Sequence, residues 1–276
     1  MTKLGTLDFN NFVMATHPET LERYFTSLSA ENAPTGWATL NGQALEEFIE
    51  AAPNAELSAI VKQDFRRVSD LALRGTGLLF SSYDRFKVDF DHTSKPQELA
   101  LRAFLDHREV WDYAWARFLL CALDSKVSVY QFPPCTPRYE EFQVSMFREA
   151  LSGSYLKQAK GPECNVAAFP SEEGHIVFVK RGYYVRTASH WNSEAVDILS
   201  YRPALEDVLI FDPFSRQLTV KAPQIRERED YVRLFAAHFA GDMTLGEQAL
   251  NTRTFDLTPI QNGTFNYNGD GRIVRV

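Results

Sequence analysis

Acidic residues and a lysine lie on two neighbouring extended stretches late in the chain. Glu206, Asp207 and Asp212 belong to the first stretch, and Lys221 ends the second. Carboxylates of this kind hold divalent cations, and a lysine beside the ion can activate the reacting water. Asp207, Asp212 and Lys221 are therefore the candidate catalytic residues, with Glu206 as a further acid.

This arrangement resembles a degenerate PD-(D/E)xK nuclease core, in which one strand carries an acid and the next carries an acid-x-Lys pair. The likeness covers residues 206–221 and departs from the pattern at Thr219, where the second acid would stand. Threonine is a weaker ligand than carboxylate for a hard cation. The alternative interpretation, which we favour, is an ordinary hairpin with Asp207 and Asp212 at strand ends or turns.

A second group of possible metal ligands is Asp89, Asp91 and His92. It places two carboxylates on one side of an extended segment, with an imidazole next to them. No second cluster in the sequence completes four ligands. We therefore expect no metal site, and we expect no cofactor because the usual phosphate-loop, dinucleotide and serine-hydrolase motifs are missing.

Several cations and aromatic residues are interleaved between residues 180 and 202. Such a pattern can bind single-stranded nucleic acid by stacking and charge. The candidates are Lys180, Arg181, Tyr184, Arg186, Trp191 and Arg202. We expect a tight hairpin turn at Arg181-Gly182 between strands 176–180 and 183–187, so that these cations form its tip. A basic turn that only keeps the hairpin hydrated is the alternative.

The composition limits the classes of partner. The chain has 276 residues, 45% of them hydrophobic and 13% aromatic, and a formal net charge of −7. This charge provides no global attraction to nucleic acid or anionic lipid. Many large apolar residues suit a protein interface as well as a core.

The chain is expected to be cytoplasmic. No apolar run approaches the length of a membrane helix, about 20 residues. The N-terminus lacks the charged and then apolar segments of a secretory signal. The three cysteines fit neither a zinc nor a disulfide pattern and are expected to be reduced. Cys121 is expected in an apolar helix face, and Cys164 is expected to be more exposed.

The hydrophobic period changes from helical to strand-like near Gly153, which predicts an α+β fold. We expect a helical region over 1–153, packed as one body on a mostly antiparallel sheet over 154–276 with one covering helix at about 225–240. The helical spacing of apolar residues predicts a single long helix from Pro96 to Leu119. Strands or a loop are expected before it, at 77–80 and 86–90. Strand-like segments continue to Val276.

These observations favour a non-enzymatic binding or adaptor subunit of a larger assembly, whose partner is another protein or a second copy. Two alternatives stay open. One is the divergent metal-dependent nuclease-like domain, and the other is a nucleic-acid-binding accessory protein, for example of bacterial defence or mobile elements.

Overall fold

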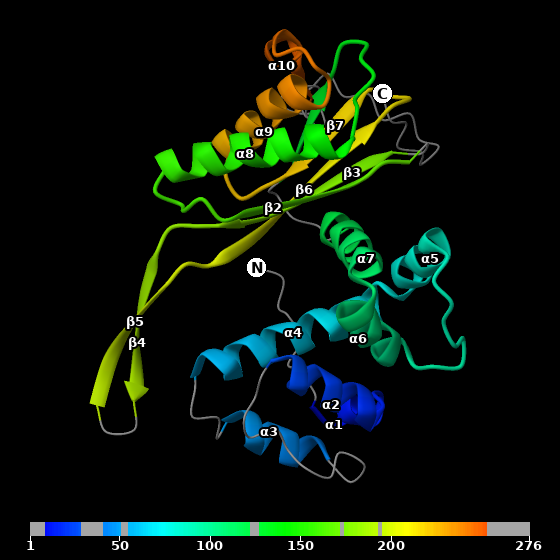
Figure 1. Cartoon of the computed structure of the whole chain (residues 1–276), viewed down its shortest axis with the longest axis vertical. Coiled ribbons are helices and arrows are strands. Elements are labelled where there is room, and N and C mark those ends of the chain that lie inside the picture. The colour runs from blue at the N-terminus through cyan, green and yellow to red at the C-terminus, as the bar shows by residue number, and fades with distance from the viewer. Residues whose placement is uncertain are drawn as a thin grey trace, which may run out of the picture. The chain divides into compact units, whose positions relative to one another are not determined.

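The computed structural model describes residues 9–28, 41–50, 55–121, 127–171, 174–192 and 195–252. Contacts divide the chain into two units, Met1–Leu123 and Asp124–Val276. The first is helical and the second contains the β-sheets (Figure 1). The α+β class predicted from the change of period is confirmed.

The helical unit contains seven helices in its described part. They are α1 (Phe9–Met14), α2 (Pro18–Ser27), α3 (Gly42–Glu50), α4 (Ala55–Arg74), α5 (Thr76–Phe86), α6 (Pro96–Asp106) and α7 (Arg108–Cys121). Aromatic rings fill much of the core: Phe65 stacks on Phe12 with ring centroids 4.0 Å apart and also contacts Tyr24 and Phe25.

Two elements of this unit differ from the sequence prediction. The single helix expected from Pro96 to Leu119 is two helices, because His107 leaves the helical region with φ −129° and ψ 67°. The strand or loop expected at residues 77–80 is part of helix α5. Short apolar runs fit helix and strand equally well, and here packing of α5 against α7 selects the helix.

The sheet unit contains strands on both sides of a long helix in the sequence. In chain order its elements are β1 (Val127–Gln131), α8 (Glu141–Lys157), β2 (Cys164–Phe169), β3 (His175–Gly182), β4 (Arg186–Asn192), β5 (Ala195–Tyr201), β6 (Ala204–Asp212), β7 (Gln217–Lys221), α9 (Ile225–His238), α10 (Thr244–Gln248) and β8 (Leu250–Thr252). Strand β1 lies in this unit although it precedes the change of period at Gly153, and helix α8, also in this unit, runs through Gly153.

Six strands form one antiparallel sheet in the order β2-β3-β6-β7-β1-β8. Helices α8 and α9 cover the same face (Figure 1), so two helices cover the sheet where one was expected. Side chains of alternate strand residues, such as Val177 and Leu209, meet Phe147 of α8 and Phe235 of α9 in a common core. Burial of these side chains is the main source of stability for this unit.

One hairpin prediction is confirmed and the other is wrong. Strands β6 and β7 pair from Asp212↔Gln217 to Val208↔Lys221, as expected. The turn expected at Arg181-Gly182 does not exist, because both residues lie inside β3, which pairs with β2 and β6. The chain instead continues into β4, which pairs with β5 in a separate two-stranded sheet.

The predicted strand-like segments after Thr252 lie outside the described residues. None of the helices within the described ranges is both long and apolar enough to cross a bilayer.

Phe235 tests the core of the sheet unit. Its ring is fully buried and lies 5.4 Å from Phe211 and 5.6 Å from Phe132, measured between centroids. Phe235→Ala should lower the free energy of unfolding by about 3–5 kcal/mol in urea denaturation. Phe214→Ala is the control, because Phe214 is 83% exposed. Equal stability of the two variants would contradict the described packing.

Protonation of His175 should lower the free energy of unfolding in mild acid. Burial lowers the pKa of His175, whose Nδ1 accepts a hydrogen bond from the Ser171 amide at 3.3 Å. Since the unfolded chain takes up the proton more readily, stability is present above the unfolded pKa, about 6.5, and is lost as the pH falls through the lower folded value. His175→Gln should therefore lose less stability than the parent between about pH 7.5 and about pH 5.5, the range in which histidine titrates, as followed by urea denaturation. Identical pH dependence of parent and variant would refute this role.

Candidate functional site

The acids and the lysine of the nuclease-like pattern do not converge. In β6 and β7, Lys221 pairs with Val208 and shares its face of the sheet, whereas the neighbouring Asp207 points to the opposite face. Glu206 lies on the Lys221 face, two residues before Val208. A metal with a lysine beside it needs these groups in one cleft, and the strand register separates Asp207 from Lys221.

Asp212 stabilises the turn between β6 and β7. Its carboxylate accepts hydrogen bonds from the Ser215 hydroxyl at 2.6 Å and from the Phe214 amide at 2.8 Å. These bonds, the Ser215 hydroxyl first, lower the pKa of Asp212. The residue therefore has the structural role of an Asx turn between β6 and β7, as the hairpin interpretation expects.

The second candidate group also has other roles. Asp91 accepts hydrogen bonds from the hydroxyl and amide of Thr93 at 2.7 and 2.9 Å, which lower its pKa, and the His92 ring lies 4.3 Å from that of Phe90. Asp89 lines a small polar pocket of the helical unit. Among the described residues, no group of three His, Cys, Asp or Glu side chains is placed to hold a metal ion.

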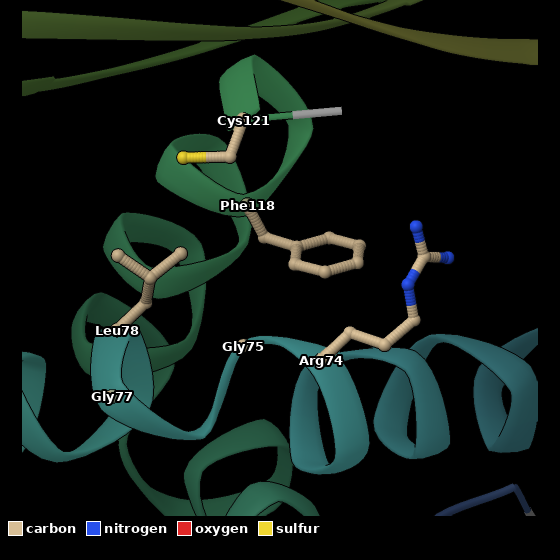
Figure 2. Close-up of a pocket in the computed structure, with 6 residues that line it drawn as sticks. All are labelled: Arg74, Gly75, Gly77, Leu78, Phe118 and Cys121. Carbon is tan, nitrogen blue, oxygen red and sulfur yellow. The ribbon is translucent and has the colours of Figure 1, made fainter. Parts of the chain in front are cut away.

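A more apolar pocket of about 390 Å³ lies where α4 meets α5 in the helical unit (Figure 2). Arg74 lies over the ring of Phe118 and forms a 3.5 Å ion pair with Asp70. Cys121 lies at the rim and is exposed, although it was expected in the core. The side chains around this pocket form no catalytic constellation of nucleophile and base.

The six basic and aromatic candidates are distributed over β3, β4 and the connections between strands, and do not gather at a hairpin tip. Arg181 is fully buried, and Lys180 lies over the Phe178 ring. Tyr184 and Arg186 are exposed, and Trp191 lies in β4 opposite Val196. Arg202 pairs with Glu163 at 3.8 Å and donates to two backbone carbonyls.

The buried Arg181 belongs to a cluster of charges inside the sheet unit. Its Nε donates to Asp207 Oδ2 at 2.5 Å, and its Nη2 lies 2.9 Å from Glu227 Oε2. The other carboxylate oxygen of Glu227 accepts a hydrogen bond from Lys160 Nζ at 2.7 Å. Since all four side chains are at most 3% exposed, two cations and two anions balance away from water.

Two tyrosines complete this buried cluster. The Tyr155 hydroxyl donates to Tyr231 at 2.7 Å, and the Tyr231 hydroxyl donates to Asp207 at 2.8 Å. Burial raises the pKa of both phenols, which therefore remain protonated donors. Burial also raises the pKa of Asp207, while Arg181 and Tyr231 favour its charged form. Burial similarly raises the pKa of Cys164 to about 12, which favours the protonated thiol over the more reactive thiolate at neutral pH.

Strands β4 and β5, residues 186–192 and 195–201, extend away from the six-stranded sheet as an arm (Figure 1). Within the described residues, each of these strands pairs only with the other. Large apolar side chains of the arm are exposed: Val196 by 56%, Ile198 by 69%, Leu199 by 39% and Tyr201 by 43%.

Both faces of the arm carry exposed apolar groups. By alternation, Val196 and Ile198 lie on one face, and Leu199 and Tyr201 lie on the other. A two-stranded ribbon is marginally stable in water, and the outer edge of a strand is where another strand can add. The arm therefore presents apolar side chains to solvent on both of its faces.

No family model matches this chain, and neither does any curated protein. The function must therefore be inferred from the geometry of the arm and of the buried cluster.

The sequence pattern did not reveal most residues of the buried cluster or the exposure of the arm. Lys160 and Glu227 are far from Arg181 in the sequence, and nothing local marks them as its partners. Apolar residues at both parities in 195–201 would fit a strand covered on both faces. The pattern was therefore visible, but the exposure of the arm was not.

Substitution of Glu227 tests how much the buried charge cluster contributes to stability. Glu227→Ala should lower the free energy of unfolding by about 3–5 kcal/mol, because it leaves Lys160 and Arg181 short of a carboxylate inside the protein. Glu229→Ala is the matched control, since Glu229 is exposed on the same helix. If urea denaturation finds the two variants equally stable, the described ion pairs contribute nothing.

Proposed function

We propose that this chain is a non-enzymatic, protein-binding subunit that joins its partner through the β4–β5 arm. The observation that carries the proposal is the exposure of Val196, Ile198, Leu199 and Tyr201 on a ribbon of only two strands. On each face of the ribbon two of these side chains are neighbours, and exposed apolar surface that is more than a scatter of single residues is typical of interaction sites.

The charges of the arm favour a protein over a nucleic acid as its partner. Nucleic-acid affinity depends on cations that can neutralise phosphates. Arg181 is buried, and Arg202 is held by Glu163 and by backbone carbonyls at the base of the arm. Arg186 is exposed, but β5 supplies apolar side chains beside it.

The strand geometry suggests how the partner binds. An extended segment of another protein can add to an unpaired strand edge, with main-chain hydrogen bonds for affinity and alternate side chains for specificity. Because β5 carries the exposed apolar residues, we infer that a partner strand with apolar residues at alternate positions pairs along β5.

We also infer that this binding takes place in the cytoplasm. Cys121, Cys135 and Cys164 are free thiols, which suits a reducing compartment. Secreted proteins more commonly pair their cysteines.

Site-specific photo-crosslinking in cells tests the proposal. A photoreactive residue placed at Ile198 should give a discrete crosslinked product with one protein, because this side chain would lie in the interface. The same residue at Phe214, which is also exposed, is the control and should give no such product.

The mass and identity of the product show whether the partner is a second copy or a different protein. A Val196→Ser substitution should weaken the crosslink at position 198, whereas Leu73→Ser, at an exposed position of helix α4, should leave it unchanged. Absence of a product at position 198, or equal products at positions 198 and 214, would contradict the proposal.

A further inference from the structure

The arm meets the six-stranded sheet at an elbow made of Tyr183, Tyr184 and Arg202. Strand β3 ends at Gly182 and β4 begins at Arg186, while β5 ends at Tyr201 and β6 begins at Ala204. Two short connections therefore set the direction of the whole arm. Their contacts with the body of the sheet unit include cation–π contacts and hydrogen bonds.

Two buried cations face the aromatic rings of the elbow. Lys160 Nζ lies 5.7 Å from the Tyr183 ring centroid and 5.3 Å from that of Tyr184. Arg181 Cζ lies 5.7 Å from the Tyr183 centroid. Both cations are within the distance at which a ring attracts a positive charge, and the attraction is stronger where water is excluded.

The rings are also held to each other and to helix α9. Tyr183 and Tyr184 meet edge to face with centroids 4.9 Å apart. The Tyr183 hydroxyl accepts a hydrogen bond from Gln224 Nε2 at 2.8 Å. Since Gln224 is the N-cap of α9, the elbow is tied directly to the start of that helix.

Close backbone packing holds the other connection. Arg202 Nη1 donates to the carbonyl oxygens of Tyr183 at 2.8 Å and Ala159 at 3.2 Å. A Cβ atom at Gly182 would lie 2.7 Å from the Lys160 carbonyl oxygen and 2.8 Å from Arg202 Cδ. Glycine at this position lets the strand approach the turn after α8, and a side chain would push it away.

We propose that Lys160 is the positioning residue of the arm: its buried ammonium holds the Tyr183 and Tyr184 rings, so that the free chain already presents the arm in its binding direction. The position of the ammonium is itself fixed, because Glu227 and Gln158 each accept a 2.7 Å hydrogen bond from it. This inference rests on the proposed binding function of the arm.

Prior positioning of the arm has a consequence for binding. Association costs free energy when it orders groups that move in the free protein, and a surface already held in place avoids that cost. The elbow would therefore affect partner affinity without any of its residues touching the partner.

Pulsed electron–electron double resonance, which measures the distance between two spin labels, tests the direction of the arm in the full chain without a partner. Spin labels on encoded noncanonical residues at Ser189 of β4 and Glu229 of α9 leave the native cysteines in place, and both positions are exposed. The parent should give one narrow distance peak. Lys160→Met should lose that peak and give a broad distribution.

A second set of variants covers the case in which Lys160→Met fails to fold. Tyr183→Leu with Tyr184→Leu removes the rings but keeps the charge balance, and should also broaden the distribution. Tyr183→Phe with Tyr184→Phe keeps both rings and should keep the narrow peak. A broad distribution in the parent, or a narrow one in the leucine variant, would overturn the inference.

The crosslink at position 198 separates this inference from the proposed function. In the leucine variant its yield should fall severalfold, while the phenylalanine variant should retain it. A narrow parent peak without any crosslink would refute binding by the arm and leave the positioning by Lys160 standing.

Discussion

The compensation of charge among Lys160, Arg181, Asp207 and Glu227 is the constraint on which the sheet unit depends. These side chains come from the turn after α8, from β3, from β6 and from α9. Each buried charge would be costly alone, so the four segments must assemble together for any of them to be tolerated. The cluster thus adds a requirement of position to a core that apolar packing stabilises.

The same constraint explains how an exposed ribbon can have a defined origin. Arg181 and Asp207 lie on the two strands that lead into the arm, and Lys160 faces the elbow rings. A two-stranded ribbon with apolar groups on both faces gains little from its own packing. Its order at the base therefore has to come from the body of the sheet unit, where the buried charges fix both strands.

Periodicity predicted the parts of this fold that are encoded locally. The hairpin over 207–221 and the helix from Ile225 follow from alternation, from turn residues and from a helical stripe. The break at His107 was not predictable, because the apolar stripe continues through it. Alternation also could not distinguish a strand that pairs in the main sheet from one that pairs in a separate ribbon.

The candidate site was less predictable than the fold, for a related reason. The segment around Arg181 was singled out as a basic and aromatic surface, but Arg181 is buried, and Asp207 and Glu227 neutralise its charge inside the protein. Neither partner is close to Arg181 in the sequence. Only the three-dimensional register of β3, β6 and α9 distinguishes a buried ion pair from a solvated cation.

Hydrogen exchange of the arm amides tests binding by the arm most directly. The measurement compares residues 186–192 and 195–201 in the native assembly, purified from its cells, with the same residues in the isolated chain. Binding by the arm predicts strong protection of these amides in the assembly, with the largest change in β5, and little change in the six-stranded sheet. Equal exchange of the arm in both states would contradict it.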